Sequence, residues 1–464
     1  MAGPVDTKLE GMAKSFRPYD LNQQLLLPPD LRDWLPEGHL ALFVSDVIDE
    51  LNLAAIVQAY DGDERGQPPY HPAMMVKLLL YAYCTGRPSS RRIERATHED
   101  VACRVLAADQ HPDHDSIAAF RQRHLPALAA LFVQVLQLCR AAGLVTLGHV
   151  ALDGTKVKAN ASKHKAMSYA RMGDTQARLE REVRELLAHA QEVDATEDAQ
   201  YGRGQRGDSL PAELARRESR LAKIRAAKAA LEQEAKAEAT AAAAAVRAKL
   251  AARAQGVIGR QGRAPVPPDP EAAQPAPSAQ RNFTDPESRI MKDGATGSFE
   301  QAYNAQAVVD GHAQIIVAAD VLQGAGDRPY LVPMLRAMQA NLQAWPTIVT
   351  ADGGYFSEAN LETLASTPVD LYVPPDRRRP GPRPINAPAG PRAEAMRAKL
   401  LTPAAQEVYA RRKVIVEPVF GQIKEVRGFR RFSFRGLRRV AAEWSLICLT
   451  HNLVKLHRAR FATT

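Results

Sequence analysis

The sequence is poor in cysteine, and its cysteines are not spaced as metal ligands are. Only four occur in 464 residues: Cys84, Cys103, Cys139 and Cys448. They are far apart in the chain and lack the paired spacing of a zinc site. We therefore expect reduced and mostly buried thiols, as is usual for a cytosolic protein.

Long hydrophobic runs are also lacking. The N-terminus, from Met1 to Arg17, has no apolar core of signal-peptide length. No stretch reaches the roughly 18 continuous apolar residues that span a bilayer, and no tandem repeat of fixed period is present. These absences predict a soluble, cytoplasmic protein that does not enter a membrane.

Acidic residues are outnumbered by basic ones. The chain has 61 Lys and Arg against 52 Asp and Glu, which gives a formal net charge of +9 and a pI near 9.4. An excess of this size is compatible with a polyanionic partner. Many basic proteins bind no nucleic acid, however, so composition alone leaves the partner open.

The first predicted domain, residues 1–145, is helical. Residues 40–53 and 74–83 are apolar at helical spacing, and His71-Pro72 marks a helix start. A cluster of arginines lies in this domain, namely Arg87, Arg91, Arg92, Arg95 and Arg121. The domain is either a plain helical bundle with a solvated basic face or a DNA-binding domain. It has no clean recognition-helix motif, so the residues that would read a DNA sequence are unassigned.

An α/β domain is predicted over 146–164 and 281–439, interrupted by a helical insertion at 165–280. The insertion is rich in Ala, Arg, Lys and Glu, and its irregular helical spacing favours a helical hairpin over a long coiled coil. We expect helices at 175–197 and 211–255, a Gly-rich turn at 201–208, a Pro- and Ala-rich linker at 264–279, and a C-terminal packing helix at 440–464.

Two predicted strands each end in an aspartate. The predicted strand at 150–153 ends at Asp153, and the predicted strand at 347–351 is followed directly by Asp352. Between these two strands we expect strands at 302–309 and 315–321 and a helix at 328–343. After them we expect a strand at 371–373, a Pro- and Arg-rich loop at 374–391 and a helix at 392–424. Glu417 lies on that last helix. This order of elements matches a ribonuclease-H-like nucleotidyltransferase core, which is an α/β fold.

Three carboxylates from distant segments can converge to hold two divalent ions about 3.5–4 Å apart, as phosphodiester chemistry requires. An all-oxygen ligand set suits Mg²⁺, with Mn²⁺ as an alternative. A lone Asp at a strand end is more often a turn or cap residue, so the prediction depends on the order of the three acids together. Of the other acids, Asp310 and Asp320 fit turn residues, and Asp285 is either structural or part of the site.

Short motifs in both domains carry a family resemblance. The N-terminal ones are Pro69-Tyr70-His71-Pro72, Leu79-Leu80-Tyr81-Ala82-Tyr83, Ser89-Ser90-Arg91 and His114-Asp115-Ser116-Ile117. The others are Leu152-Asp153-Gly154-Thr155-Lys156, the segment 282–289, Ala351-Asp352-Gly353-Gly354-Tyr355 and the segment 412–424. In these motifs the chain resembles bacterial insertion-sequence transposases of the DDE type. The resemblance implies that Asp153, Asp352 and Glu417 bind metal and catalyse DNA cleavage and joining.

The resemblance extends to a basic motif around Glu417. Related transposases carry a Tyr, an Arg, the catalytic Glu and a Lys seven positions after it, and Lys424 lies at that spacing. The expected Arg position holds Lys413, with Arg412 beside it, so either residue could serve. The family also implies a double-stranded DNA partner with terminal inverted repeats, at least a dimer on DNA, and association with the nucleoid.

Residues 411–439 form a strongly basic stretch, with ten Lys or Arg and two Glu. Phe429, Phe432 and Phe434 interleave with its arginines, either to stack on bases or, as we favour, as core residues. The residues expected to bind DNA are Arg412, Lys413, Lys424, Arg427, Arg430, Arg431 and Arg435, together with Arg91 and Arg92.

Two rival functions fit the same motifs. One is a metal-dependent nuclease on the same core, which hydrolyses DNA but does not join ends. The other is a DNA-binding protein derived from a transposase and without catalysis. Because all three acids and Lys424 are present, the sequence favours the transposase.

Overall fold

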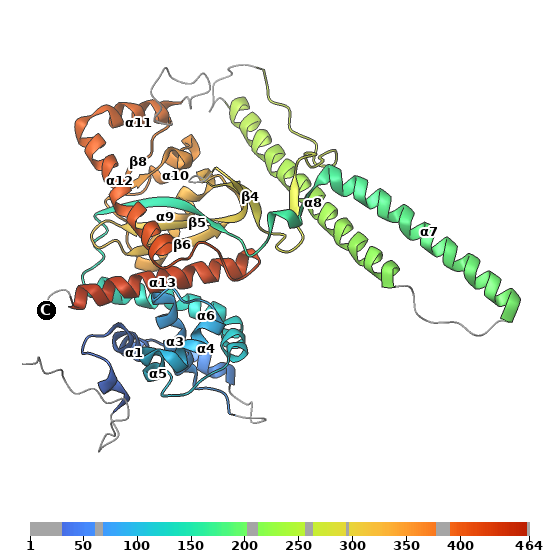
Figure 1. The fold of residues 1–464 in the computed structure, drawn as a ribbon. Helices are drawn as coiled ribbons and strands as arrows, with labels where there is room; N and C mark the ends of the chain where they lie inside the picture. Colours follow the sequence, from blue (N-terminus) through green and yellow to red (C-terminus); the bar gives the residue numbers. More distant parts are fainter. Residues whose placement is uncertain are drawn as a thin grey trace, which may run out of the picture.

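The structure is a computed structural model of the chain. It describes residues 30–60, 68–201, 212–255, 263–293, 297–376 and 390–461. Most of the predicted Gly-rich turn at 201–208 and of the Pro- and Arg-rich loop at 374–391 lies outside the described residues. Figure 1 shows a helical N-terminal part, a sheet covered by helices, and a long helical arm.

The N-terminal part is helical, as the sequence predicts. Its elements are η1 (Leu31–Trp34), α1 (Leu40–Glu50), α2 (Ala54–Val57), η2 (Gln58–Tyr60), α3 (Pro72–Cys84), α4 (Ser90–Glu99), α5 (Val101–Leu106) and α6 (His114–Ala141). Helix α3 is buried over most of its length. It begins at Pro72, whose fixed φ suits the first turn of a helix.

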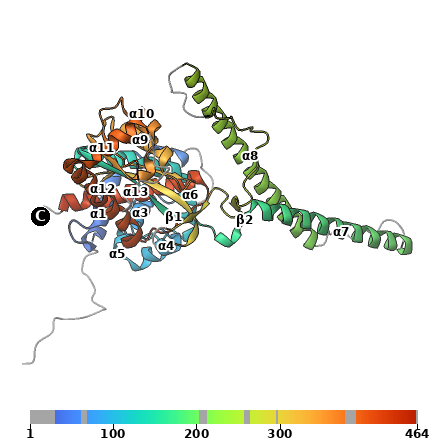
Figure 2. The ribbon, with the colours of Figure 1, turned by 90° about the horizontal axis from the view of Figure 1, so that it is seen from above.

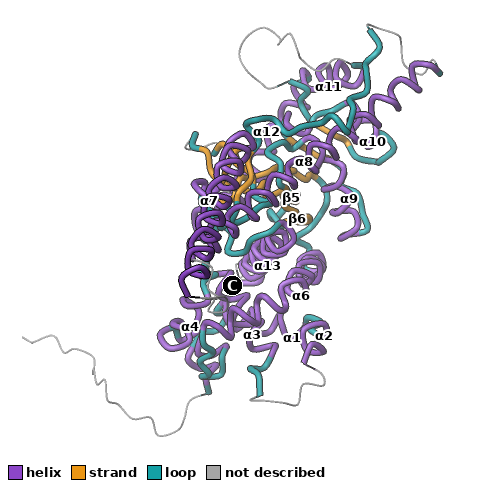
Figure 3. Tube along the Cα trace, turned by 90° about the vertical axis from the view of Figure 1, so that its right-hand side faces the viewer, coloured by secondary structure: helices purple, strands orange, loops and turns teal. Residues whose placement is uncertain are grey.

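Helix α6 is the one described helix that is long and apolar enough to span a membrane by length and composition. It contains the buried polar residues Arg121 and His124. It packs along α13 (Leu437–Phe461), which also contacts α3 and β6. Its apolar character is thus explained by core packing between the N-terminal part and the sheet (Figure 3).

The central sheet is mixed. Its strands are β1 (His149–Lys158), β4 (Arg289–Lys292), β5 (Phe299–Asp310), β6 (Ile316–Leu322), β7 (Ile348–Ala351) and β8 (Asp370–Tyr372), and β2 (Ala166–Ser168) pairs separately with β3 (Gln280–Asn282). The order is β4-β5-β1-β7-β8, with β6 also paired to β5. Strand β5 is antiparallel to β1, whereas β7 is parallel to β1 and to β8.

The expected end of the first strand at Asp153 is wrong. Strand β1 continues to Lys158, because its antiparallel pairing with β5 runs on from Val150–Asp310 to Lys158–Ala302. Its parallel pairing with β7 does stop at Leu152–Ala351. Asp153 therefore lies where one partner strand ends and the other continues.

Helices cover the sheet, as Figure 1 shows. They are η4 (Arg328–Tyr330), α9 (Leu331–Leu342), η5 (Gly353–Tyr355), α10 (Glu358–Leu364), α11 (Pro391–Leu401), α12 (Pro403–Gly421), the π-helical turn η6 (Gln422–Val426) and α13. The single helix expected at 392–424 is interrupted at Thr402, where Pro403 begins a new helix and the Thr402 side chain caps it through the Ala405 amide.

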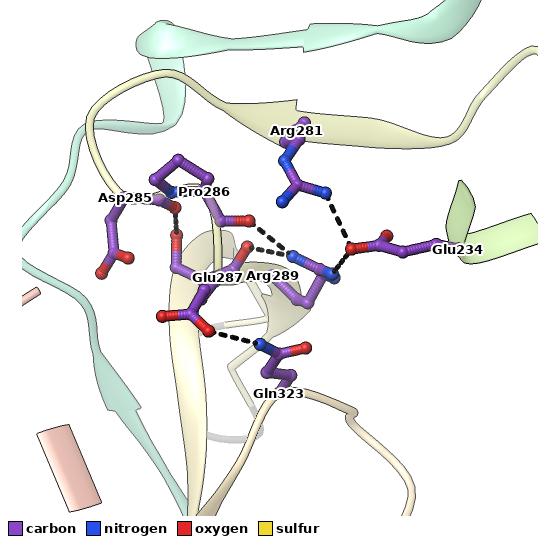
Figure 4. Close-up of polar contacts among 8 residues, drawn as sticks. Glu234, Arg281, Asp285, Pro286, Glu287, Arg289 and Gln323 are labelled. Atoms are coloured by element: carbon purple, nitrogen blue, oxygen red, sulfur yellow. Dashed lines mark hydrogen bonds and ion pairs between the residues drawn. The ribbon is translucent and has the colours of Figure 1, made fainter. Parts of the chain in front are cut away.

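The insertion forms a hairpin arm of α7 (Tyr169–Tyr201) and α8 (Ala212–Ala254), and Figures 1 and 2 agree that it projects away from the sheet. A small apolar core includes Met172, Leu179 and Ile224. At the base of the arm, the Glu234 carboxylate binds both Arg281 and Arg289 at 2.7 and 2.9 Å (Figure 4).

Gly86 lies just after α3 with a φ of +72°, and we predict that Gly86→Ala destabilises the protein. An added Cβ would lie 2.4 Å from the backbone carbonyl oxygen of Arg427. The left-handed strain and this clash together are expected to lower the free energy of unfolding by roughly 2–4 kcal/mol. Denaturant unfolding checks this. Gly143→Ala is the control, because its φ is also positive but its added Cβ meets nothing within 4 Å. An equal loss of stability in both variants would contradict the clash.

Candidate active site

Two of the three predicted catalytic acids lie side by side: Asp153 within β1, and Asp352 directly after the neighbouring strand β7. The parallel register pairs Leu152 with Ala351, and each aspartate is the next residue after one member of this pair. Asp352 also caps η5, because its side chain accepts a hydrogen bond of 2.8 Å from the Gly354 amide. The backbone thus fixes both carboxylates at the point where β1 and β7 separate.

Asp153 lies in a partly buried setting that resists negative charge. The pKa of Asp153 is raised to about 6, chiefly by burial and to a smaller extent by the nearby Asp352 carboxylate, while Arg412 and the Gly154 amide act to lower it. Arg412 lies on α12, and its guanidinium donates to Asp153 Oδ2 at a distance of 2.7 Å. Arg412 therefore supplies positive charge beside two carboxylates that repel each other.

The third predicted acid, Glu417, is exposed on α12. Within the described part of the chain it has no hydrogen bond or ion pair, and no three His, Cys, Asp or Glu side chains are grouped to hold a metal. Lys424 does reach β1, where its Nζ donates to Thr155 Oγ1 and to the Lys156 carbonyl oxygen at 3.0 Å each. The structure brings together Asp153, Asp352 and Arg412. Lys424 lies further along β1, at Thr155 and Lys156, and Glu417 is not grouped with the aspartates.

The residues present fit a divalent cation. Asp153 and Asp352 offer oxygen ligands, which Mg²⁺ prefers, and they interact electrostatically. The Arg412 guanidinium on Asp153 Oδ2 shows that this carboxylate binds a positive group, and it offsets part of the repulsion between the two aspartates. Glu417 has no other partner among the described residues and lies on the same helix as Arg412.

The predicted DNA-binding residues divide by burial. The exposed ones are Lys413, Arg430, Arg431, Arg435, Arg91 and Arg92. Arg427 is only 5% exposed and donates to Thr450 Oγ1 and the Ile447 carbonyl oxygen of α13. Because its side chain does not reach the surface, Arg427 has a structural role and is not proposed to contact DNA.

The aromatic and acidic residues that the sequence left open have structural roles. Phe429, Phe432 and Phe434 are buried, in accordance with the core alternative. Asp285 is buried and accepts from the Tyr303 hydroxyl and the Gly436 amide. Asp310 is buried and accepts from the Thr146, Leu147 and His312 amides, whereas Asp320 lies within β6 rather than at its end.

Sequence reasoning missed a polar network on β5 beside the aspartates. Asn304 and Gln306 both donate to Asp327 Oδ1, at 2.6 and 2.9 Å, and the Tyr355 hydroxyl donates to Gln306. A Cβ added to Gly354 would lie 2.9 Å from an Asp352 oxygen and 3.3 Å from an Asp327 oxygen, so these carboxylates flank Gly354. The sequence signal was Asn304 and Gln306 alternating with apolar residues along a strand.

Two family models match the chain. Residues 275–453 match the transposase DDE domain, and residues 29–123 match the transposase domain (DUF772). Together the matches cover more than half of the chain. The chain belongs to the DDE-type transposases of insertion sequences, the family that its motifs indicated. Asp153 precedes the DDE match, so its assignment depends on its position beside Asp352. No curated protein and no solved structure matches the chain.

Proposed function

We propose that the protein binds the terminal inverted repeats of its mobile element in double-stranded DNA and performs metal-dependent cleavage and strand transfer. The observation that carries this proposal is the placement of Asp153 and Asp352 side by side where β1 and β7 separate. The strand order β6-β5-β1-β7-β8 supports a ribonuclease-H-like core. We further propose action in the cytoplasm at the nucleoid, as at least a dimer on DNA.

Asp153, Asp352 and Glu417 would hold the divalent ions, Mg²⁺ or Mn²⁺. When bound, such ions lower the pKa of an attacking water or 3′-hydroxyl and stabilise the leaving oxygen. Arg412 orients the Asp153 carboxylate through its 2.7 Å contact. Lys424, on η6, contacts β1 at Thr155, two residues beyond Asp153, and would hold a substrate phosphate near the acids.

The test is incubation of the full chain and Mg²⁺ with a duplex that carries the element's own end. We expect cutting at the end, followed by joining of pre-cleaved ends to a target duplex. Cutting without joining would favour the nuclease. Specific binding without cutting, in Mg²⁺ and in Mn²⁺, would favour the non-catalytic DNA-binding protein.

Asp327 is proposed as a positioning residue, and we predict that Asp327→Asn lowers the cleavage rate about 10- to 100-fold. The substitution removes the charge that accepts from Asn304 and Gln306 beside Asp352. Single-turnover cleavage as a function of Mg²⁺ concentration checks this. A positioning role requires a changed Mg²⁺ dependence with unchanged DNA affinity. A wild-type rate and Mg²⁺ dependence would contradict it.

A further inference from the structure

A basic hollow lies at the base of the arm, away from the aspartates. Its volume is about 480 Å³, and it is lined by residues 160–165, by Thr284 and Glu300, and by Arg431 and Arg435. Lys163, His164 and Lys165 come from the turn after β1, and Arg431 and Arg435 come from the segment before α13. Lys163, His164 and Lys165 are not among the residues that the family motifs or the basic stretch at 411–439 indicated.

The positive charge of this hollow is not neutralised. The one acidic residue in its lining, Glu300, is paired with Lys158 at 3.3 Å. Among the residues that the structure describes, the side chains of Lys163, Lys165 and Arg431 have no hydrogen bond or ion pair. By contrast, Arg281 and Arg289 at the same junction share the Glu234 carboxylate (Figure 4). Unpaired cations on one hollow indicate an anionic ligand.

The two segments that carry the cations are held together by the backbone. The Lys158 amide donates to the Arg430 carbonyl oxygen at 3.0 Å, and the Phe432 amide donates to the Lys158 carbonyl oxygen at 2.9 Å. The Asn160 side chain donates to the Ser433 carbonyl oxygen at 2.7 Å, and Arg435 donates to the Asn160 carbonyl oxygen at 2.9 Å. The backbone that carries the cations is therefore held in place before a ligand binds, which lowers the entropy cost of binding.

The hollow lies further along the strand that carries Asp153. With a rise of about 3.3 Å per residue, the end of β1 at Lys158 lies about 17 Å from Asp153. Lys424 contacts β1 between these two points, at Thr155 and Lys156. Phosphates of one strand follow each other about every 3.4 Å along the duplex axis, so Lys158 lies several phosphate spacings from Asp153, and the hollow begins beyond it, at Asn160. An extended polyanion fits this arrangement better than a small anion does.

We propose that this hollow binds backbone phosphates of the DNA substrate, several base pairs from the phosphate that reacts. The proposal rests on the proposed function, since it takes DNA as the substrate. Lys163, Lys165 and Arg431 contact the phosphates. They contribute affinity without reading sequence, because phosphate contacts carry no base information.

The test is binding of the full chain to a random-sequence duplex over a range of KCl concentrations. The variants are Lys163→Gln/Lys165→Gln and Arg431→Gln, with Lys163→Arg/Lys165→Arg to restore the charge. We expect the two neutral variants to bind more weakly. Their slope of log K against log salt should fall by about 0.9 for each phosphate that the protein no longer neutralises. Arg336→Gln on α9, another exposed cation, is the control and is expected to match wild type.

Failure of this proposal is distinguishable from failure of the proposed function, because a random duplex needs neither an element end nor cleavage. Neutral variants that match wild type in affinity and slope would overturn the hollow as a phosphate site. So would a Lys→Arg double variant that binds as weakly as the neutral one. A wild type that shows the expected slopes but never cuts element ends would overturn only the proposed function.

Discussion

Asp352→Asn is expected to lower the rate of DNA end cleavage by at least about a thousand-fold, because the amide replaces a charged oxygen ligand of the proposed ions. The fold is expected to survive. Asp352 caps η5 by accepting from the Gly354 amide, and an asparagine oxygen accepts the same bond. Single-turnover cleavage of an end duplex in Mg²⁺ measures the loss.

DNA binding separates this effect from loss of structure. Asp352→Asn is expected to bind the end duplex at least as tightly as wild type, since it removes a negative charge beside the substrate. Asp153→Asn should lose cleavage to a similar degree, although it also loses the charged partner of Arg412. Cleavage by Asp352→Asn at a rate close to that of wild type would show that this carboxylate is not a catalytic ligand.

Arg412→Gln is expected to lower cleavage about 10- to 100-fold, the range typical of residues that orient a metal ligand. Arg412 is the residue of the 412–413 pair that reaches Asp153, whereas Lys413 is exposed on α12. Without the guanidinium, Asp153 loses the partner that orients its carboxylate. Cleavage rate and DNA affinity, measured side by side, report the two contributions separately.

Lys413→Gln is the matched control, because it removes the same charge one residue away. We expect it to weaken DNA binding slightly and to leave the cleavage rate of the bound complex near wild type. If Lys413→Gln instead caused the larger loss of cleavage, Lys413 would be the basic residue of the family signature, and the contact between Arg412 and Asp153 would be structural.

The strands that carry the aspartates could be predicted from local pattern. Short apolar runs, followed by Gly154 in one case and by Gly353-Gly354 in the other, marked both Asp153 and Asp352. What the pattern could not show is that β1 continues past Asp153, because that continuation depends on pairing with β5, which lies far away in the sequence beyond the helical insertion. Long-range pairing of this kind is not encoded in the period of a single segment.

The burial of charged residues was the second feature that could not be predicted from the sequence. Arg427 and Arg431 occupy the same basic stretch and look alike by composition. Only the packing of α13 distinguishes them, since it buries Arg427 against Ile447 and Thr450 and leaves Arg431 exposed. Asp327 was missed for a related reason: its partners Asn304 and Gln306 come from a strand earlier in the chain.

Asp153, Asp352 and Glu417 are proposed to form one metal site on DNA, and Glu417 is its least constrained member. The most direct test is the single-turnover rate at which Glu417→Gln cleaves an end duplex in Mg²⁺. Glu407→Gln, an exposed acid on the same helix, is the control. We predict a loss of at least about a thousand-fold for Glu417→Gln and none for Glu407→Gln. A wild-type rate for Glu417→Gln would contradict a three-carboxylate site.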